Sequence, residues 1–145
     1  MGNQDVTTHK FVAILNKKIE PGKAMNALSH MSVGLVACAT PEEIREMGFS
    51  DYVDKDGGTH PSVSKNSYVI LRADNSNQIR TARKLAIEKG IRMTDFTSSM
   101  QEGTYVEQHE RTNNTPEAEL EYYGLCLFGE IAAVNEIARK FQLWK

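Results

Sequence analysis

Three side chains that suit a hydrolytic or anion-binding site fall at helical spacing near the start of the chain. Lys23, Asn26 and His30 follow one another at steps of three and four residues, so a helix beginning near Lys23 presents all three on one face. Because an imidazole titrates near neutral pH, His30 can act as a general base that activates water for attack on an ester. The alternative is a half-buried histidine with a structural role.

The turn before this helix has the composition of an anion-binding site. Pro21 supplies the backbone φ of a first helical turn, and Gly22 allows another group to approach the backbone closely. The free N–H groups of that turn and the Lys23 ammonium would hold a phosphate or an oxyanion. The alternative is a solvated lysine at a helix start, where its charge opposes the helix dipole.

A carboxylate and a hydroxyl follow in the third predicted strand and just beyond it. Asp95 lies at the carboxyl end of this strand and would orient His30 if the strand runs parallel to the one that precedes Gly22. Ser99 is a candidate donor to an oxyanion. The alternative for both Asp95 and Ser99 is a structural role as ordinary turn residues. The expected site is catalytic His30, Asp95 and Lys23, with ligand binding by Gly22, Lys23, Asn26 and Ser99.

Hydrophobic patterning predicts the elements that would position these residues. Core strands are expected at 11–15, 67–73, 91–96 and 122–128. Helices are expected at about 23–39, 41–47, 76–89 and 129–143. The turn-rich segment 51–65 suits a hairpin around Asp56-Gly57. Segment 97–121 shows no convincing helix or core strand, and a loop this long is usually functional or mobile.

The order of these elements predicts a single α/β domain over residues 1–145. Crossover helices connect the first three strands, which are therefore expected to be parallel if they share a sheet. The fourth strand arrives through a loop and is expected to run antiparallel. The result is a three-layer α/β/α sandwich with a four-stranded mixed sheet.

Composition limits the partners. The net charge of −2 indicates no broad basic surface, although Lys17, Lys18 and Lys23 form a local basic cluster. No apolar run approaches the roughly 20 residues of a membrane span, and no secretory signal is visible. Both cysteines lie in apolar stretches and are expected to be reduced and buried, as in a cytoplasmic protein without a membrane partner. No metal or other cofactor is expected, because the histidines lack ligand spacing.

Several stretches resemble the type II peptidyl-tRNA hydrolases. These stretches are the strand followed by Gly22-Lys23 and then Ser29-His30, the run SYVILRA…ARKLAIEKGIRMTDF, and the run YYGLCLFGEIAAVNEIARKFQL. The resemblance spans most of the chain except 47–66 and 100–121. The opening KFVAILNKKIEPGKAMNALSHM is still more similar to an uncharacterised family of small proteins, a domain of unknown function assigned the same fold.

The resemblance implies a four-stranded mixed sheet between helices, often in a homodimer, that hydrolyses the ester joining a peptide to tRNA. Lys23 matches the second lysine of the family's Lys-Gly-Lys element, His30 matches its histidine and Asp95 the aspartate that ends its third strand. Ser99 keeps the hydroxyl of a threonine. Two other positions depart from the pattern, because the chain has Pro21 in place of a lysine and Ala27 in place of a glutamine.

Three functions follow as expectations. The first is hydrolysis of the peptidyl-tRNA type, in which His30 and Asp95 activate water. The alternative is a non-catalytic binding module for a small anionic ligand or an RNA end. The third is a dimeric structural protein whose segment 97–121 contacts a partner.

Overall fold

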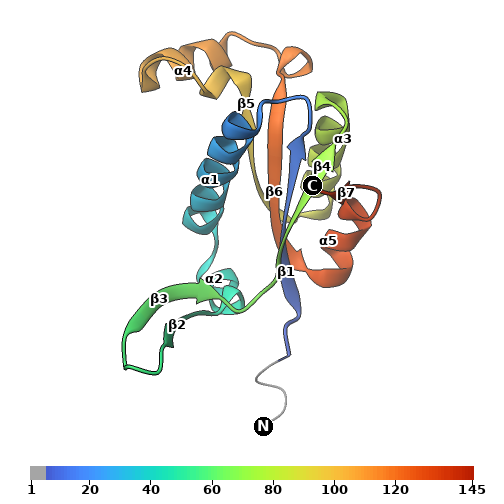
Figure 1. Ribbon diagram of the computed structural model, residues 1–145. Helices are drawn as coiled ribbons and strands as arrows, with labels where there is room; N and C mark the ends of the chain where they lie inside the picture. The colour runs from blue at the N-terminus through green and yellow to red at the C-terminus, as the bar shows by residue number, and fades with distance from the viewer. Residues whose placement is uncertain (1–5) are drawn as a thin grey trace.

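The computed structural model describes residues 6–145, which form a five-stranded sheet, a separate two-stranded hairpin and five α-helices (Figure 1). The strands are β1 (His9–Asn16), β2 (Phe49–Val53), β3 (Thr59–Ser64), β4 (Tyr68–Ala73), β5 (Arg92–Thr97), β6 (Tyr122–Glu130) and β7 (Gln142–Leu143). The helices are α1 (Pro21–Cys38), α2 (Pro41–Met47), α3 (Ser76–Lys89), α4 (Tyr105–Asn113) and α5 (Ile131–Ala138).

The sheet is mixed, with the strand order β5-β6-β1-β4-β7. β1 pairs parallel with β4 and antiparallel with β6, and β6 pairs antiparallel with β5. β1, β4 and β5 therefore share one direction and β6 opposes them, as predicted. The prediction of four strands was wrong by one, because the chain after α5 turns back and pairs β7 with Leu71 and Arg72 of β4.

Helices cover both faces of the sheet and make three layers (Figure 1). On one face α1 packs on β5, β6 and β1 through buried Ala24, Ala27, Met31 and Leu35. On the other face α3 and α5 contribute buried residues such as Ile79 and Ile137 to a second core cluster. β1 and β6 are buried over most of their length because both of their faces are covered.

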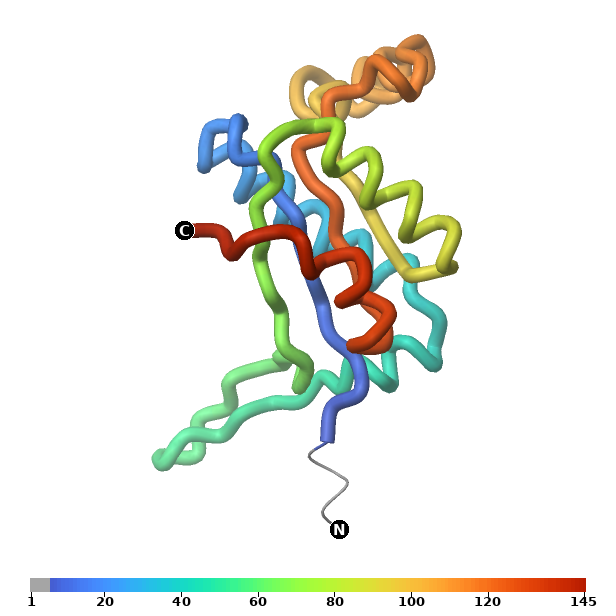
Figure 2. The backbone as a smooth tube through the Cα atoms, turned by 90° about the vertical axis from the view of Figure 1, so that its right-hand side faces the viewer, coloured from blue at the N-terminus to red at the C-terminus, as the bar shows by residue number. Residues whose placement is uncertain are grey.

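The predicted hairpin is confirmed as β2 and β3, which pair antiparallel. Gly57 at its tip has φ 84°, a left-handed conformation that glycine adopts without strain. The hairpin projects from the body beside α2 (Figures 1 and 2), and nearly all of its side chains are exposed.

Segment 97–121 is not the structureless loop that the sequence pattern indicated. It contains α4 between two short 3-10 helices, η2 (Ser98–Met100) and η3 (Glu117–Glu119). The Thr104 side chain accepts a hydrogen bond from Glu107 N, and the Glu107 side chain accepts one from Thr104 N, so α4 begins with a complete capping box. α4 has no buried residue, which explains why hydrophobic periodicity did not reveal it.

Candidate functional site

His30 lies on the exposed surface of α1, above the carboxyl end of β5. Its ring stacks on Phe96, with centroids 5.7 Å apart. One residue earlier in β5, Asp95 points to the opposite face of the sheet, because side chains alternate along a strand. There its carboxylate accepts a hydrogen bond from Arg83 Nε of α3 at 2.7 Å. The expected pairing of His30 with Asp95 is therefore not found.

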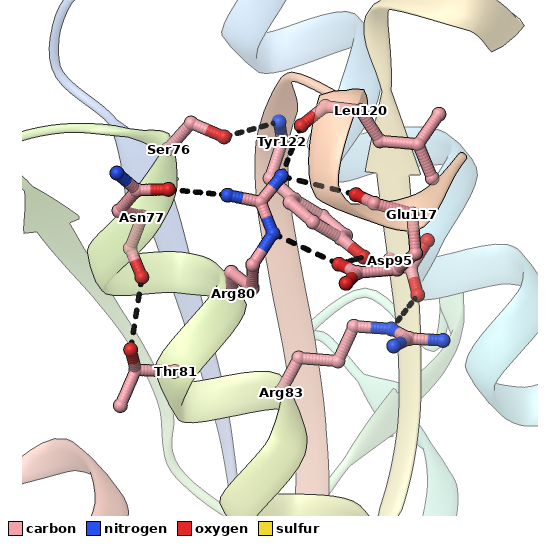
Figure 3. Close-up of polar contacts among 9 residues, drawn as sticks. All are labelled: Ser76, Asn77, Arg80, Thr81, Arg83, Asp95, Glu117, Leu120 and Tyr122. Atoms are coloured by element: carbon pink, nitrogen blue, oxygen red, sulfur yellow. Dashed lines mark hydrogen bonds and ion pairs between the residues drawn. The ribbon is translucent and has the colours of Figure 1, made fainter. Parts of the chain in front are cut away.

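Asp95 belongs instead to a polar network between α3 and the chain before β6 (Figure 3). Arg80 donates from Nε to the Glu117 carboxylate at 2.9 Å and from Nη2 to the Glu117 and Leu120 carbonyls. The guanidinium groups of Arg80 and Arg83 also lie over the Tyr122 ring, 5.2 and 5.8 Å from its centroid. Arg80 and Arg83 each pair with a carboxylate in this network. We therefore interpret the network of Arg80, Arg83, Asp95, Glu117 and Tyr122 as a structural clasp that holds segment 97–121 beside α3.

The same network changes the acidities of two of its members. Burial and the hydrogen bond to Glu117 raise the pKa of Tyr122 to about 12. The hydrogen bonds from Tyr122 and Arg80 lower the pKa of Glu117. These shifts keep the phenol neutral and the carboxylate charged, which suits a structural role rather than proton transfer near neutral pH.

The start of α1 already holds an anion from the chain itself. The Glu20 carboxylate accepts a hydrogen bond from Gly22 N at 3.0 Å and caps the helix. Lys23 and Asn26 are exposed on the same side of α1 as His30, as predicted. Ser99 is 4% exposed and its hydroxyl is hydrogen-bonded to those of Thr97 and Thr112. Ser99 is therefore not part of the exposed group formed by Lys23, Asn26 and His30.

A basic cleft lies at the carboxyl ends of β1 and β4, where open α/β sheets bind ligands. One pocket of about 230 Å³ is lined by Lys17, Arg72 and Lys140 together with Asp74. An adjoining pocket of about 320 Å³ shares Lys17 and Arg72 and adds Ile19, Trp144 and Lys145. We call Lys17, Arg72, Lys140 and Lys145 the basic cleft.

Three elements bring the basic cleft together. Lys17 directly follows β1 and Arg72 is the next-to-last residue of β4, while Lys140 and Lys145 lie in the segment that carries β7. Trp144 N donates to Ile70 O at 2.9 Å, and Arg72 Nη2 donates to Gln142 Oε1 at 2.6 Å, so this segment is fixed beside β4. Asp74 pairs with Lys17 at 2.9 Å, which lowers the pKa of the carboxyl group. Four cations against one carboxylate leave a net positive cleft.

Only part of the basic cleft could be predicted from the sequence. Lys17 and Arg72 both stand at strand ends and could have been grouped by the rule that the carboxyl ends of parallel strands meet. Lys140 and Lys145 could not, because only the pairing of β7 with β4 brings them there.

No group of three or more His, Cys, Asp and Glu side chains in residues 6–145 is arranged to hold a metal ion. No helix in the described range is long and apolar enough to cross a membrane. Cys126 is buried as expected, but Cys38 is exposed at the end of α1, so the expectation for Cys38 was wrong.

Comparison with known proteins identifies a family and a similar structure for the chain but no activity. The family described as "Protein of unknown function (DUF2000)" matches residues 9–145. The structure of the protein of unknown function Atu0240 from Agrobacterium tumefaciens strain C58 is similar, with a TM-score of 0.80 and 17% identity. The alignment covers 97% of this chain and 100% of that one, and at this identity it shows a shared fold alone. No curated protein matches the chain.

Proposed function

The chain belongs to the DUF2000 family of proteins of unknown function. From its own residues, we propose that it is a non-catalytic binding module for a small anionic ligand. The ligand site is the basic cleft. The observation that carries this proposal is the convergence of Lys17, Arg72 and Lys140 on one pocket at the carboxyl ends of two parallel strands.

The chemistry of the basic cleft favours a phosphorylated ligand. A guanidinium presents a planar fork of donors to phosphate oxygens, and the flanking ammonium groups add charge without fixed geometry. Phe141 in one pocket and Trp144 in the other supply apolar surface beside these cations. The cleft is therefore suited to a phosphate that carries a planar or apolar group, and the end of an RNA has the same chemistry.

The test measures binding of inorganic pyrophosphate and of deacylated tRNA by thermal shift and titration calorimetry. We expect pyrophosphate to stabilise the wild-type protein. Binding should weaken about tenfold or more when Lys17 and Lys140 are both changed to Ala, since each charge-assisted contact contributes about 1 kcal/mol or more.

The matched control changes two exposed lysines of α3 away from the cleft, Lys84→Ala with Lys89→Ala, and so removes the same charge. This variant should bind like the wild type. Equal weakening in both double variants would show nonspecific attraction, and the absence of any anion-dependent shift would end the proposal. Binding of tRNA alone would identify an RNA end as the ligand.

Hydrolysis of the peptidyl-tRNA type is the second candidate function. The observation that favours it is the common exposed side of α1 on which Lys23, Asn26 and His30 lie. In this case His30 would activate water without a carboxylate partner, since Asp95 is paired with Arg83. The resemblance of the sequence to the type II peptidyl-tRNA hydrolases would make tRNA the partner in this case.

Turnover of a synthetic peptidyl-tRNA distinguishes the two candidates. A hydrolase should release free peptide, and His30→Ala should reduce the rate about a hundredfold or more, as loss of a general base usually does. His109→Ala is a control, because His109 lies on α4 and is not one of the three side chains that share a side of α1. Turnover no faster than with heat-denatured protein would remove this candidate and leave the binding module.

A further inference from the structure

Among residues 6–145, part of the α1 side of the sheet is not covered by a helix. α1 packs mainly on β5, β6 and β1, and the next strand, β4, is only partly covered on this side. Tyr68 hydrogen-bonds to Ser32 of α1, and Ile70 packs near Trp144, so both lie on this side of the sheet. Strand alternation places Arg72 there as well. We call this strip, together with the adjoining hairpin of β2 and β3, the open face.

The hairpin end of the open face is apolar. Phe49, Tyr52, Val53 and Val63 are between 41% and 67% exposed. A groove of about 250 Å³ separates the hairpin from α1 and is lined mainly by apolar side chains, among them Phe11, Val36 and Tyr68. An isolated two-stranded hairpin is marginally stable in water, and an apolar patch of this kind marks a site of protein association.

The two ends of the open face carry opposite charge. The hairpin has three carboxylates, Asp51, Asp54 and Asp56, against the single cation Lys55. The basic cleft lies at the other end, around Arg72. Figure 2 shows β4 running from the base of the hairpin, with the C-terminal segment crossing it further along. Tyr68 and Arg72 are four residues apart, or about 13 Å along a strand.

We infer that two copies of this chain pair through the open face, related by a two-fold axis near Ile70. Such an axis brings the acidic hairpin of one copy to the basic cleft of the other, and the same contact is made twice. The apolar side chains of each hairpin then pack over the uncovered part of β4 in the partner. Charge complementarity at both ends selects a second copy as the occupant.

This inference goes beyond the proposed function and does not depend on it, because the pairing is measured without any ligand. Sedimentation velocity over a range of protein concentrations should show a monomer–dimer equilibrium. The dimer should weaken at high salt, since the charges at the two ends are exposed and screened. A monomer at every concentration would overturn the inference.

Charge reversal tests the orientation of the two copies. Asp51→Lys with Asp56→Lys makes the hairpin basic, and Lys17→Glu with Lys145→Glu reverses part of the cleft. Each double variant alone should be monomeric, because like charges face each other at both contacts. An equimolar mixture should form a heterodimer, since each hairpin then meets a cleft of opposite charge. Failure of the mixture to associate would overturn the antiparallel arrangement.

A matched pair of apolar substitutions tests the location of the interface. Val63 in the hairpin and Ile87 on α3 are 53% and 54% exposed. Val63→Asp should weaken the dimer at least tenfold, whereas Ile87→Asp should leave it unchanged. Circular dichroism establishes that both variants are folded. A dimer that survives Val63→Asp and both charge reversals would show that the copies associate elsewhere and would overturn the inference.

Discussion

Cys126 lies in the middle of β6, with its sulfur 3.1 Å from the Tyr68 hydroxyl, which in turn is 2.6 Å from Ser32 Oγ. Burial raises the pKa of the Cys126 thiol to about 11, and the same burial raises the pKa of Tyr68. The folded protein therefore favours the neutral thiol. This stabilisation is complete below the unfolded pKa near 9 and is lost as the pH rises through about 11.

We predict that the free energy of unfolding falls between pH 9 and pH 11 by an amount on the order of 2–3 kcal/mol from this thiol. Urea unfolding at several pH values measures the fall. Cys126→Ala loses packing at every pH but should show a shallower pH dependence. Equal pH dependence in the two proteins would show that the thiol makes no such contribution.

Arg80 has a side chain only 13% exposed and donates to the chain before β6 (Figure 3). Arg80→Ala removes the donor to the partly buried Leu120 carbonyl and to the exposed Glu117 carboxylate, and the loss of a hydrogen bond that involves a charged group costs about 1–3 kcal/mol. We therefore expect a loss of this size in urea unfolding. Arg139→Ala, at an exposed position, should change stability by less than about 0.5 kcal/mol. Similar values for the two variants would contradict the clasp.

The residues of the expected site were predictable only in part. The helical spacing of Lys23, Asn26 and His30 was sufficient to place them on one side of α1. Asp95 was expected at the correct end of its strand but on the wrong face, because the face depends on register and packing against α3. Glu20 was not recognised as the group that caps α1, although it precedes Pro21 directly.

Among the elements, α4 depends on its cap more than on packing. Its residues are all at least partly exposed, so the capping box supplies much of what holds its first turn. Thr104→Ala should cost about 1 kcal/mol locally and increase amide hydrogen exchange over 105–113. Thr104→Ser keeps the acceptor and should behave like the wild type. A fall of the same size in the free energy of global unfolding would contradict the prediction that the effect is local.

Element prediction succeeded where the pattern is long and failed where it is short. The strands β1, β4, β5 and β6 and the helices α1, α2 and α3 all appear close to their expected positions, because their buried faces impose a clear period. The two residues of β7 are too few to show alternation. The capping signature at Thr104 was visible in the sequence, but the lack of an apolar stripe in α4 concealed the helix.

For the whole molecule, the basic cleft connects the two proposals. If the partner's acidic hairpin lies over the cleft, pyrophosphate and the hairpin exclude each other, and by linkage each weakens the binding of the other. Saturating pyrophosphate should raise the dimer dissociation constant about fivefold or more, at the lower end of usual coupling. Sedimentation with and without pyrophosphate measures this change. Sodium chloride at the same ionic strength is the control, and an equal effect of both would indicate screening alone.

At the same scale, the sandwich, its strand directions and the hairpin followed from the sequence pattern, whereas the cleft depends on the contact of the C-terminal segment with β4. The position of β6 within the sheet affects how the chain folds during synthesis. β6 lies between β1 and β5 although it is the last long strand to be made. A nascent chain that ends before Tyr122 has β1 and β5 with no neighbour between them, so this part of the sheet forms only after residues 122–130 have left the ribosome.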